Sequence, residues 1–191
     1  NAATALTSAS AVSLSSGAST TITAAQAVAL KAKGLSQLNA VIATLDISDT
    51  AANLQSTPGA TLAAFDSVIV SDEGTLTIDV AQANAIFDSA NDGSATQNNA
   101  SNSEGSLRAT YTISDTAANI SAQIASDPDV IENATAVSVN TAATEAQAAN
   151  LISIISHGGS IAFNIEDTVA NIFSGNALDT AANINGATNV T

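Results

Sequence analysis

The sequence predicts an α/β fold, a β-helix-like repeat solenoid in which short strands and helices form about three coils of roughly 52–56 residues. The first indication is an octet of the pattern I-S-D-T-A-A-N-I, which occurs at 47–54, 113–120, 165–172 and, most loosely, 177–184. The second is an A-Q-A marker, which surrounds Gln26, Gln82 and Gln147. The third is the local pattern, because alternating apolar residues precede the first three octets.

Each predicted coil is built from the same kinds of element. Alternation predicts strands at 11–15, 20–23, 40–48, 67–71, 75–80, 107–114, 136–140 and 160–165. Ala-rich segments predict helices at 24–33, 81–90 and 144–156, and a further helix starts within each octet. Lys31, Lys33 and Gly34 are helix-stop signals, because cations and glycine suit a helix C-terminus. Units of this kind cannot bury their own apolar faces, so we expect them to stack.

The spacing of the markers predicts the domain organisation. A single solenoid domain is expected at 11–184, with repeats at 11–66, 67–134 and 135–184. The interval from marker Gln to octet Asp is 33 residues in the second repeat, against 23 and 20 in the others, because a polar loop is inserted at 91–105. Residues 1–10 form an N-terminal arm, and residues 185–191 a strand-like tail. Neither end resembles a polar cap, which predicts end-to-end association with further copies of the chain.

The octet contains two polar positions that we predict to be structural. Its Asp suits an N-cap and its Asn, a mediocre helix former, suits a side-chain-to-backbone bond that ties one turn to the next. The alternative is that the Asn residues form a row of ligands for a bound molecule. The positions concerned are Asp49, Asn53, Asp115, Asn119, Asp167, Asn171, Asp179 and Asn183.

Composition limits the classes of function. The chain has 17 acidic and three basic residues, a formal net charge of −14, so it is a poor ligand for nucleic acid or an anionic membrane. Cysteine is absent, which excludes disulfides and thiolate metal sites. No apolar run is long enough to span a membrane, and no signal peptide is visible. Because the chain begins with Asn1, we expect a processed protein or a piece of a longer one.

Candidate sites for chemistry are weak, and we predict that the protein is not an enzyme. His157, the one histidine, suits a helix C-terminus better than a Ser–His–Asp triad. We predict no resident cofactor, although calcium is chemically allowed at 88–99, an imperfect EF-hand pattern, or at 127–129. Thr-rich strands such as 20–23 would also allow ice binding, but they are ordinary in exposed sheets.

The octet and its flanks resemble repeats of very large secreted bacterial surface and adhesin-like proteins, chiefly cyanobacterial and proteobacterial. The matching segments are 44–54 and 110–120, and, for the A-Q-A element, 21–27 and 77–83. The resemblance implies an extracellular or cell-surface location and a structural or adhesive role. We therefore expect a self-associating subunit or module of an extracellular filament, sheath or surface layer. The alternative is an adhesin-type module that presents loop 91–105 to a glycan or cell-surface ligand.

Overall fold

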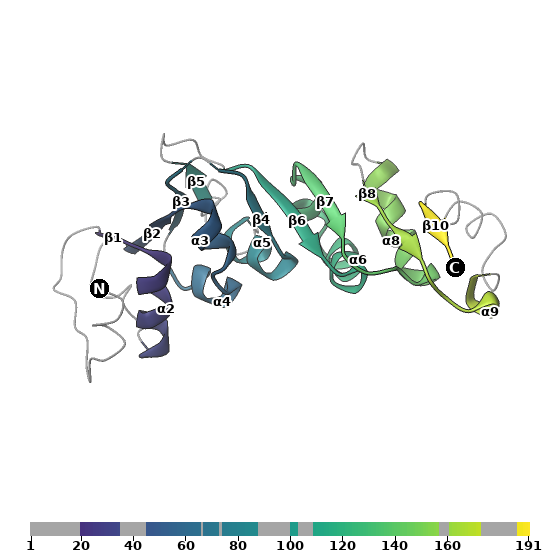
Figure 1. Cartoon of the computed structure of the whole chain (residues 1–191), viewed down its shortest axis with the longest axis horizontal. Coiled ribbons are helices and arrows are strands. Elements are labelled where there is room, and N and C mark those ends of the chain that lie inside the picture. Colours follow the sequence, from purple (N-terminus) through teal and green to yellow (C-terminus); the bar gives the residue numbers. More distant parts are fainter. Residues whose placement is uncertain are drawn as a thin grey trace. The chain divides into compact units, whose positions relative to one another are not determined.

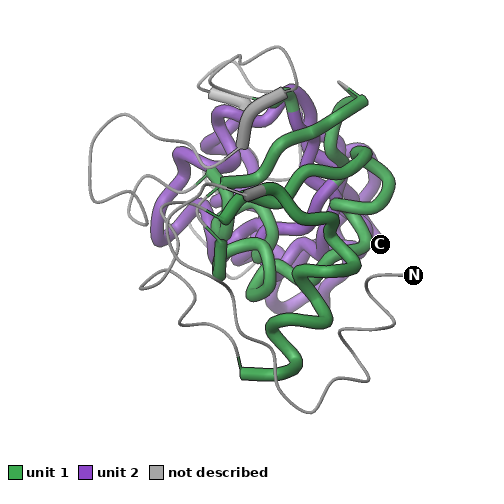
Figure 2. The backbone as a smooth tube through the Cα atoms, turned by 90° about the vertical axis from the view of Figure 1, so that its left-hand side faces the viewer, with its two compact units in different colours: residues 1–77, 81–110 green, residues 78–80, 111–191 purple. Residues whose placement is uncertain are grey.

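The structure is a computed structural model that describes residues 20–34, 45–65, 67–72, 74–87, 100–102, 109–156, 161–172 and 187–191. These residues form short helices and parallel sheets, which confirms the predicted α/β class (Figure 1). The chain divides into two compact units, one of residues 1–77 and 81–110 and one of residues 78–80 and 111–191 (Figure 2). The predicted arm, the strand at 11–15, the fourth octet and His157 lie outside the described residues.

The first unit contains a parallel sheet with the strand order β1-β2-β3-β5. Its strands are β1 (Thr20–Ile22), β2 (Leu45–Asp49), β3 (Ser67–Val70) and β5 (Ala100–Asn102). The helices of this part of the chain are α2 (Ala24–Ala32), α3 (Ala51–Gln55), α4 (Gly59–Leu62) and α5 (Val80–Phe87). Helix α2 ends as predicted, because Lys33 is its C-cap and Gly34 takes the left-handed φ of 73° that glycine tolerates best.

A sheet with the order β4-β6-β7-β8 has its last three strands in the second unit, which also contains a two-stranded sheet of β9 and β10. The strands are β4 (Leu76–Ile78), β6 (Tyr111–Asp115), β7 (Ala136–Val139), β8 (Ile161–Ala162), β9 (Asn164–Ile165) and β10 (Asn189–Val190). The pairs β6–β7, β7–β8 and β9–β10 are parallel. The helices are α6 (Ala117–Ser126), α7 (Asp129–Glu132), α8 (Glu145–Ser156) and α9 (Val169–Ile172).

The core consists of small aliphatic side chains, and the octets supply many of them. The apolar residues that begin and end the three described octets are all buried: Ile47, Leu54, Ile113, Ile120, Ile165 and Ile172. Among the described residues Tyr111 is the largest fully buried side chain, and its hydroxyl donates a hydrogen bond of 2.7 Å to the carbonyl oxygen of Val130. The Lys31 ammonium donates to the carbonyl oxygen of Ala60, which links α2 to α4.

Three elements differ from the sequence prediction. Residues 100–102, expected within loop 91–105, form strand β5 beside β3, because an edge strand needs only backbone hydrogen bonds and no apolar pattern. Helices α4 and α7 were not predicted. Each of these two helices follows a proline, Pro58 or Pro128, which suits the start of a helix. The predicted repeat boundaries stay a prediction.

Candidate functional site

The octet forms a strand-to-helix corner in each of its three described copies, but threonine caps the helix. The hydroxyls of Thr50, Thr116 and Thr168 accept hydrogen bonds of 3.2–3.4 Å from the backbone N–H three residues later. Thr50 and Thr116 have extended backbone dihedrals, as an N-cap requires. The predicted N-cap role of Asp49, Asp115 and Asp167 is therefore wrong, because the aspartate precedes the cap and is freed to bond elsewhere.

In the three described octets, one carboxylate oxygen of the Asp closes its own turn. Oδ1 of Asp115 accepts bonds from the Thr116 N–H at 2.7 Å and from the side-chain amide of Asn119 at 2.8 Å. The pairs Asp49–Asn53 and Asp167–Asn171 repeat this geometry, each at 2.7 Å between the amide nitrogen and the carboxylate. The Asn thus bonds a side chain and not the backbone of the next turn, which corrects the prediction. A charge-assisted bond explains an Asn where a better helix former would otherwise stand.

The second carboxylate oxygen of each of these aspartates bonds to a different helix, which follows the segment that lies beside the octet strand in the sheet. Oδ2 accepts a bond from the N–H of the first residue of α2, α5 and α8, respectively, and so caps a helix other than its own. The donor–acceptor pairs are Ala24 to Asp49 at 3.0 Å, Val80 to Asp115 at 3.0 Å, and Glu145 to Asp167 at 3.1 Å. Each of these three aspartates therefore joins the starts of two helices, and its charge meets the positive end of both helix dipoles.

Two residues outside the octets complete the same series. The N–H of Ala51, first in α3, donates to Oδ1 of Asp72 at 2.9 Å. The N–H of Ala117, first in α6, donates to the hydroxyl of Thr141 at 3.0 Å. Each acceptor comes just after a parallel strand, and the strand paired with it is the one that precedes the helix. The acceptor therefore lies over the start of that helix. We call the five acceptors the interlayer caps: Asp49, Asp72, Asp115, Thr141 and Asp167.

The A-Q-A markers have two different structural roles. Gln26 and Gln147 close capping boxes, because their side-chain oxygens accept from the backbone N–H of Thr23 at 2.8 Å and of Thr144 at 3.0 Å. Gln82 is buried instead, and its amide donates to the carbonyl oxygens of Gln55 and Thr57 at 2.9 and 2.7 Å. It thereby satisfies backbone acceptors at the C-terminal end of α3.

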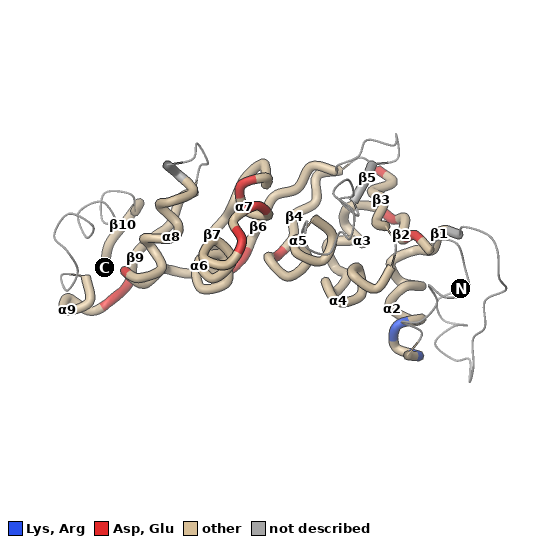
Figure 3. Tube along the Cα trace, turned by 180° about the vertical axis from the view of Figure 1, so that it is seen from behind, with Lys and Arg blue, Asp and Glu red and all other residues tan. Residues whose placement is uncertain are grey.

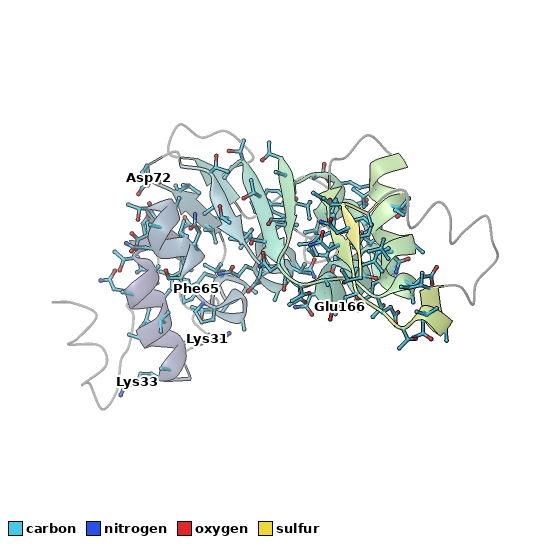
Figure 4. All side chains as sticks on the ribbon, turned by 45° about the vertical axis from the view of Figure 1, so that its right-hand side comes forward. Lys31, Lys33, Phe65, Asp72 and Glu166 are labelled. Atoms are coloured by element: carbon cyan, nitrogen blue, oxygen red, sulfur yellow. The ribbon has the colours of Figure 1, made fainter. Side chains whose placement is uncertain are left out.

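The electrostatics of two interlayer caps follow from their hydrogen bonds. The side-chain amide of Asn171, followed by the N–H groups of Thr168 and Glu145, lowers the pKa of Asp167. The N–H of Ala51 is the main cause of the lowered pKa of Asp72. Asp72, labelled in Figure 4, lies two residues after the end of β3. Figure 3 shows acidic residues in both units, whereas the described basic residues cluster at the end of α2.

The predicted candidates for chemistry gain no support from the part of the chain that is described. Within it, no three His, Cys, Asp or Glu side chains come together to hold a metal ion. The EF-hand-like segment 88–99 lies outside that part. The pair Asp127–Asp129 is a helix-start contact, because the Asp129 N–H donates to the Asp127 carboxylate at 3.2 Å. None of the described helices has the length and apolar character needed to cross a membrane.

Two shallow pockets lie in the second unit. The first, of about 370 Å³, is lined by Thr144, Glu145, Ala146, Asp167 and Asn171 and lies over an interlayer cap. The second, of about 390 Å³, opens between β7, β8, β9 and β10. Comparison of the chain with family models, with curated proteins and with solved structures finds no match.

Proposed function

We propose that the chain is a non-catalytic structural module that associates with copies of itself in an extracellular bacterial filament, sheath or surface layer. Its fold is proposed to be a β-helix-like solenoid with coils at the sequence period of about 52–56 residues. The interlayer caps carry the proposal. The recurring polar side chains of the octet use their hydrogen bonds to join layers, which is the nearest-neighbour coupling that stabilises stacked repeats. The resemblance to bacterial surface-protein repeats supports the extracellular location.

The third octet presents a surface suited to a further layer. In the first two octets the first helix residue is buried, and Ala51 lies so close to Gly74 that a Cβ there would be 2.9 Å from the Ala51 Cβ. Val169 has the equivalent position in α9 but is 75% exposed. Val190 of the neighbouring strand β10 is also exposed. Val169 is thus an exposed apolar residue at a helix start, and β10 has one strand neighbour in the described residues. Stacking of a further layer would cover a surface of this kind.

The proposed occupant of this surface is a second copy of the chain. Strand β1 also has one strand neighbour in the described residues, so it offers a complementary parallel edge. A contact between two different edges of identical chains is heterologous, and it gives an open filament when the rotation does not close. This is the geometry that a filament or layer subunit needs.

Sedimentation velocity and electron microscopy of the full chain test the proposal. The wild-type protein should form assemblies that grow with concentration. Val169→Lys should shift the chain toward the monomer, because a buried lysine without a partner opposes association. Ala118→Lys, at an exposed position of helix α6, is the matched control and should assemble as the wild type does.

Two results would contradict the proposal: a wild-type chain that stays monomeric at high concentration, or folded Val169→Lys and Ala118→Lys variants that assemble equally. Circular dichroism of both variants separates loss of assembly from loss of fold. A monomeric chain that binds cells or glycans, and loses this binding when residues 91–99 are deleted, would favour the adhesin-type function instead.

A further inference from the structure

The register of the second unit changes abruptly beside strand β7. Ser138 pairs with Ala162, but the next pairing joins Ala143 to Ile165. Four residues, 139–142, therefore lie opposite only two, 163–164. A bulge with two extra residues moves the longer segment away from its neighbour. The pocket of about 390 Å³ lies at this point, lined by Val139, Asn140, Thr141, Ala142, Ala162, Phe163, Asn164, Thr188 and Asn189.

The lining combines spare amide and hydroxyl groups with exposed methyl groups. The side-chain oxygen of Asn140 accepts from Ser114 at 3.1 Å, and that of Asn164 accepts from the Asn189 amide at 3.2 Å. The side-chain NH₂ groups of Asn140 and Asn164, and the side-chain oxygen of Asn189, have no other partner in the described residues. All three asparagines are exposed, as are Ala142 and Ala162 of the lining, whereas Phe163 is buried.

The described lining is uncharged, although the chain carries a net charge of −14. The lining lacks a carboxylate because the interlayer cap that contributes to it is Thr141, whereas the four other interlayer caps are aspartates. An uncharged site discriminates against cations that carboxylates elsewhere on the chain would attract. Its volume is at the lower end of the range for small-molecule pockets, about 300–1,000 Å³.

We propose that this pocket, the bulge pocket, binds a neutral saccharide of one or two sugar units. Sugar hydroxyls both donate and accept hydrogen bonds, so adjacent hydroxyls match the paired NH₂ and carbonyl groups of the three asparagines. The C–H face of a sugar ring matches the exposed methyl groups of Ala142 and Ala162. Because the pocket is shallow, the dissociation constant is expected near ~1 mM, about −4 kcal/mol. This binding is independent of the proposed assembly.

Side-chain amide NMR of the full ¹⁵N-labelled chain tests the inference, with glucose, galactose, N-acetylglucosamine and their disaccharides as neutral probes and glucuronate as the charged one. At least one neutral probe should shift the amide resonances of Asn140, Asn164 and Asn189 saturably, and glucuronate should bind more weakly. Ala162→Phe, which fills the pocket from β8, should weaken binding at least about tenfold. Ala136→Phe, at an exposed β7 position outside the lining, is the matched control.

The outcomes separate cleanly. Saturable shifts that Ala162→Phe abolishes and Ala136→Phe leaves unchanged support the bulge pocket as a saccharide site. Absence of saturable shifts with the whole neutral panel overturns the inference. So do equal binding by the two variants, which would place the sugar elsewhere, and equal binding of glucuronate, which would contradict selection for a neutral ligand. Asn164→Ala, an exposed substitution, provides a second variant if Ala162→Phe does not fold.

Discussion

Replacing Asp115 by alanine should destabilise the protein more than any other single change at an interlayer cap. Asp115 is the most buried of the three described octet aspartates, at 9% exposure, and its carboxylate accepts three hydrogen bonds. The bond from Val80 is buried, so its loss leaves an unsatisfied N–H at a cost of about 1–3 kcal/mol. The bonds from Thr116 and Asn119 are partly open to water and add about 0.5–1 kcal/mol each.

The expected loss of unfolding free energy is therefore about 2–5 kcal/mol, a large fraction of the roughly 5–15 kcal/mol of a typical domain. Urea unfolding of the full chain, followed by circular dichroism, measures it. Asp115→Asn should recover part of the loss, because one oxygen remains to accept from the octet turn. Asp167→Ala removes the same three bonds at a more exposed site and should cost less.

The reasoning would be refuted if Asp115→Ala lost less than about 0.5 kcal/mol, the usual effect of a surface substitution. It would also fail if Asp115→Ala and Asp167→Ala gave equal losses, because burial would then not set the strength of an interlayer cap.

Three further predictions concern stability. Asp72 and Asp167 have pKa values lowered from 3.8, so their contribution is complete above pH ~4 and is lost as the pH falls through the lower folded-state values. In the double variant Asp72→Asn with Asp167→Asn, the unfolding free energy should therefore fall less steeply as the pH is lowered below about 4. Gly59→Ala should cost about 1–3 kcal/mol in urea unfolding, because its Cβ would lie 2.8 Å from the Ala81 carbonyl oxygen. An unchanged midpoint would contradict that close approach. Tyr111→Phe should lose about 1–2 kcal/mol by leaving a buried carbonyl oxygen of α7 unsatisfied, and a thermal midpoint equal to the wild type would count against it.

The sequence was sufficient to predict the elements whose pattern is local. Alternation located β3 and β7 closely, and the signals at Lys33 and Gly34 located the end of α2. Strand β5 was missed because A-S-N has no apolar alternation, and it forms only because β3 provides a backbone edge. Helices α4 and α7 are single turns too short to show a helical period.

The role of the octet could be predicted only in part. Repetition identified Asp115 and Asn119 as structural, but not the second oxygen's partner, because Val80 is 35 residues away. That contact depends on the register of parallel strands, which a local pattern does not encode. Asp72 and Thr141 share no sequence motif with the octets and were missed for the same reason. The bulge pocket arises from a change of register, so no sequence signal marks it.

The sequence separations in the interlayer caps have a consequence for how the chain matures. Each helix start receives its acceptor from a strand that comes later in the chain, 25, 21, 35, 24 and 22 residues downstream for the five caps in order. While the chain is being synthesised, the N–H of the first helix residue therefore lacks this acceptor until the following strand emerges and docks. Folding that proceeds from the first layer onward would complete one helix start with each new strand. The chain would then fold in the same direction in which it is synthesised, from its N-terminus to its C-terminus.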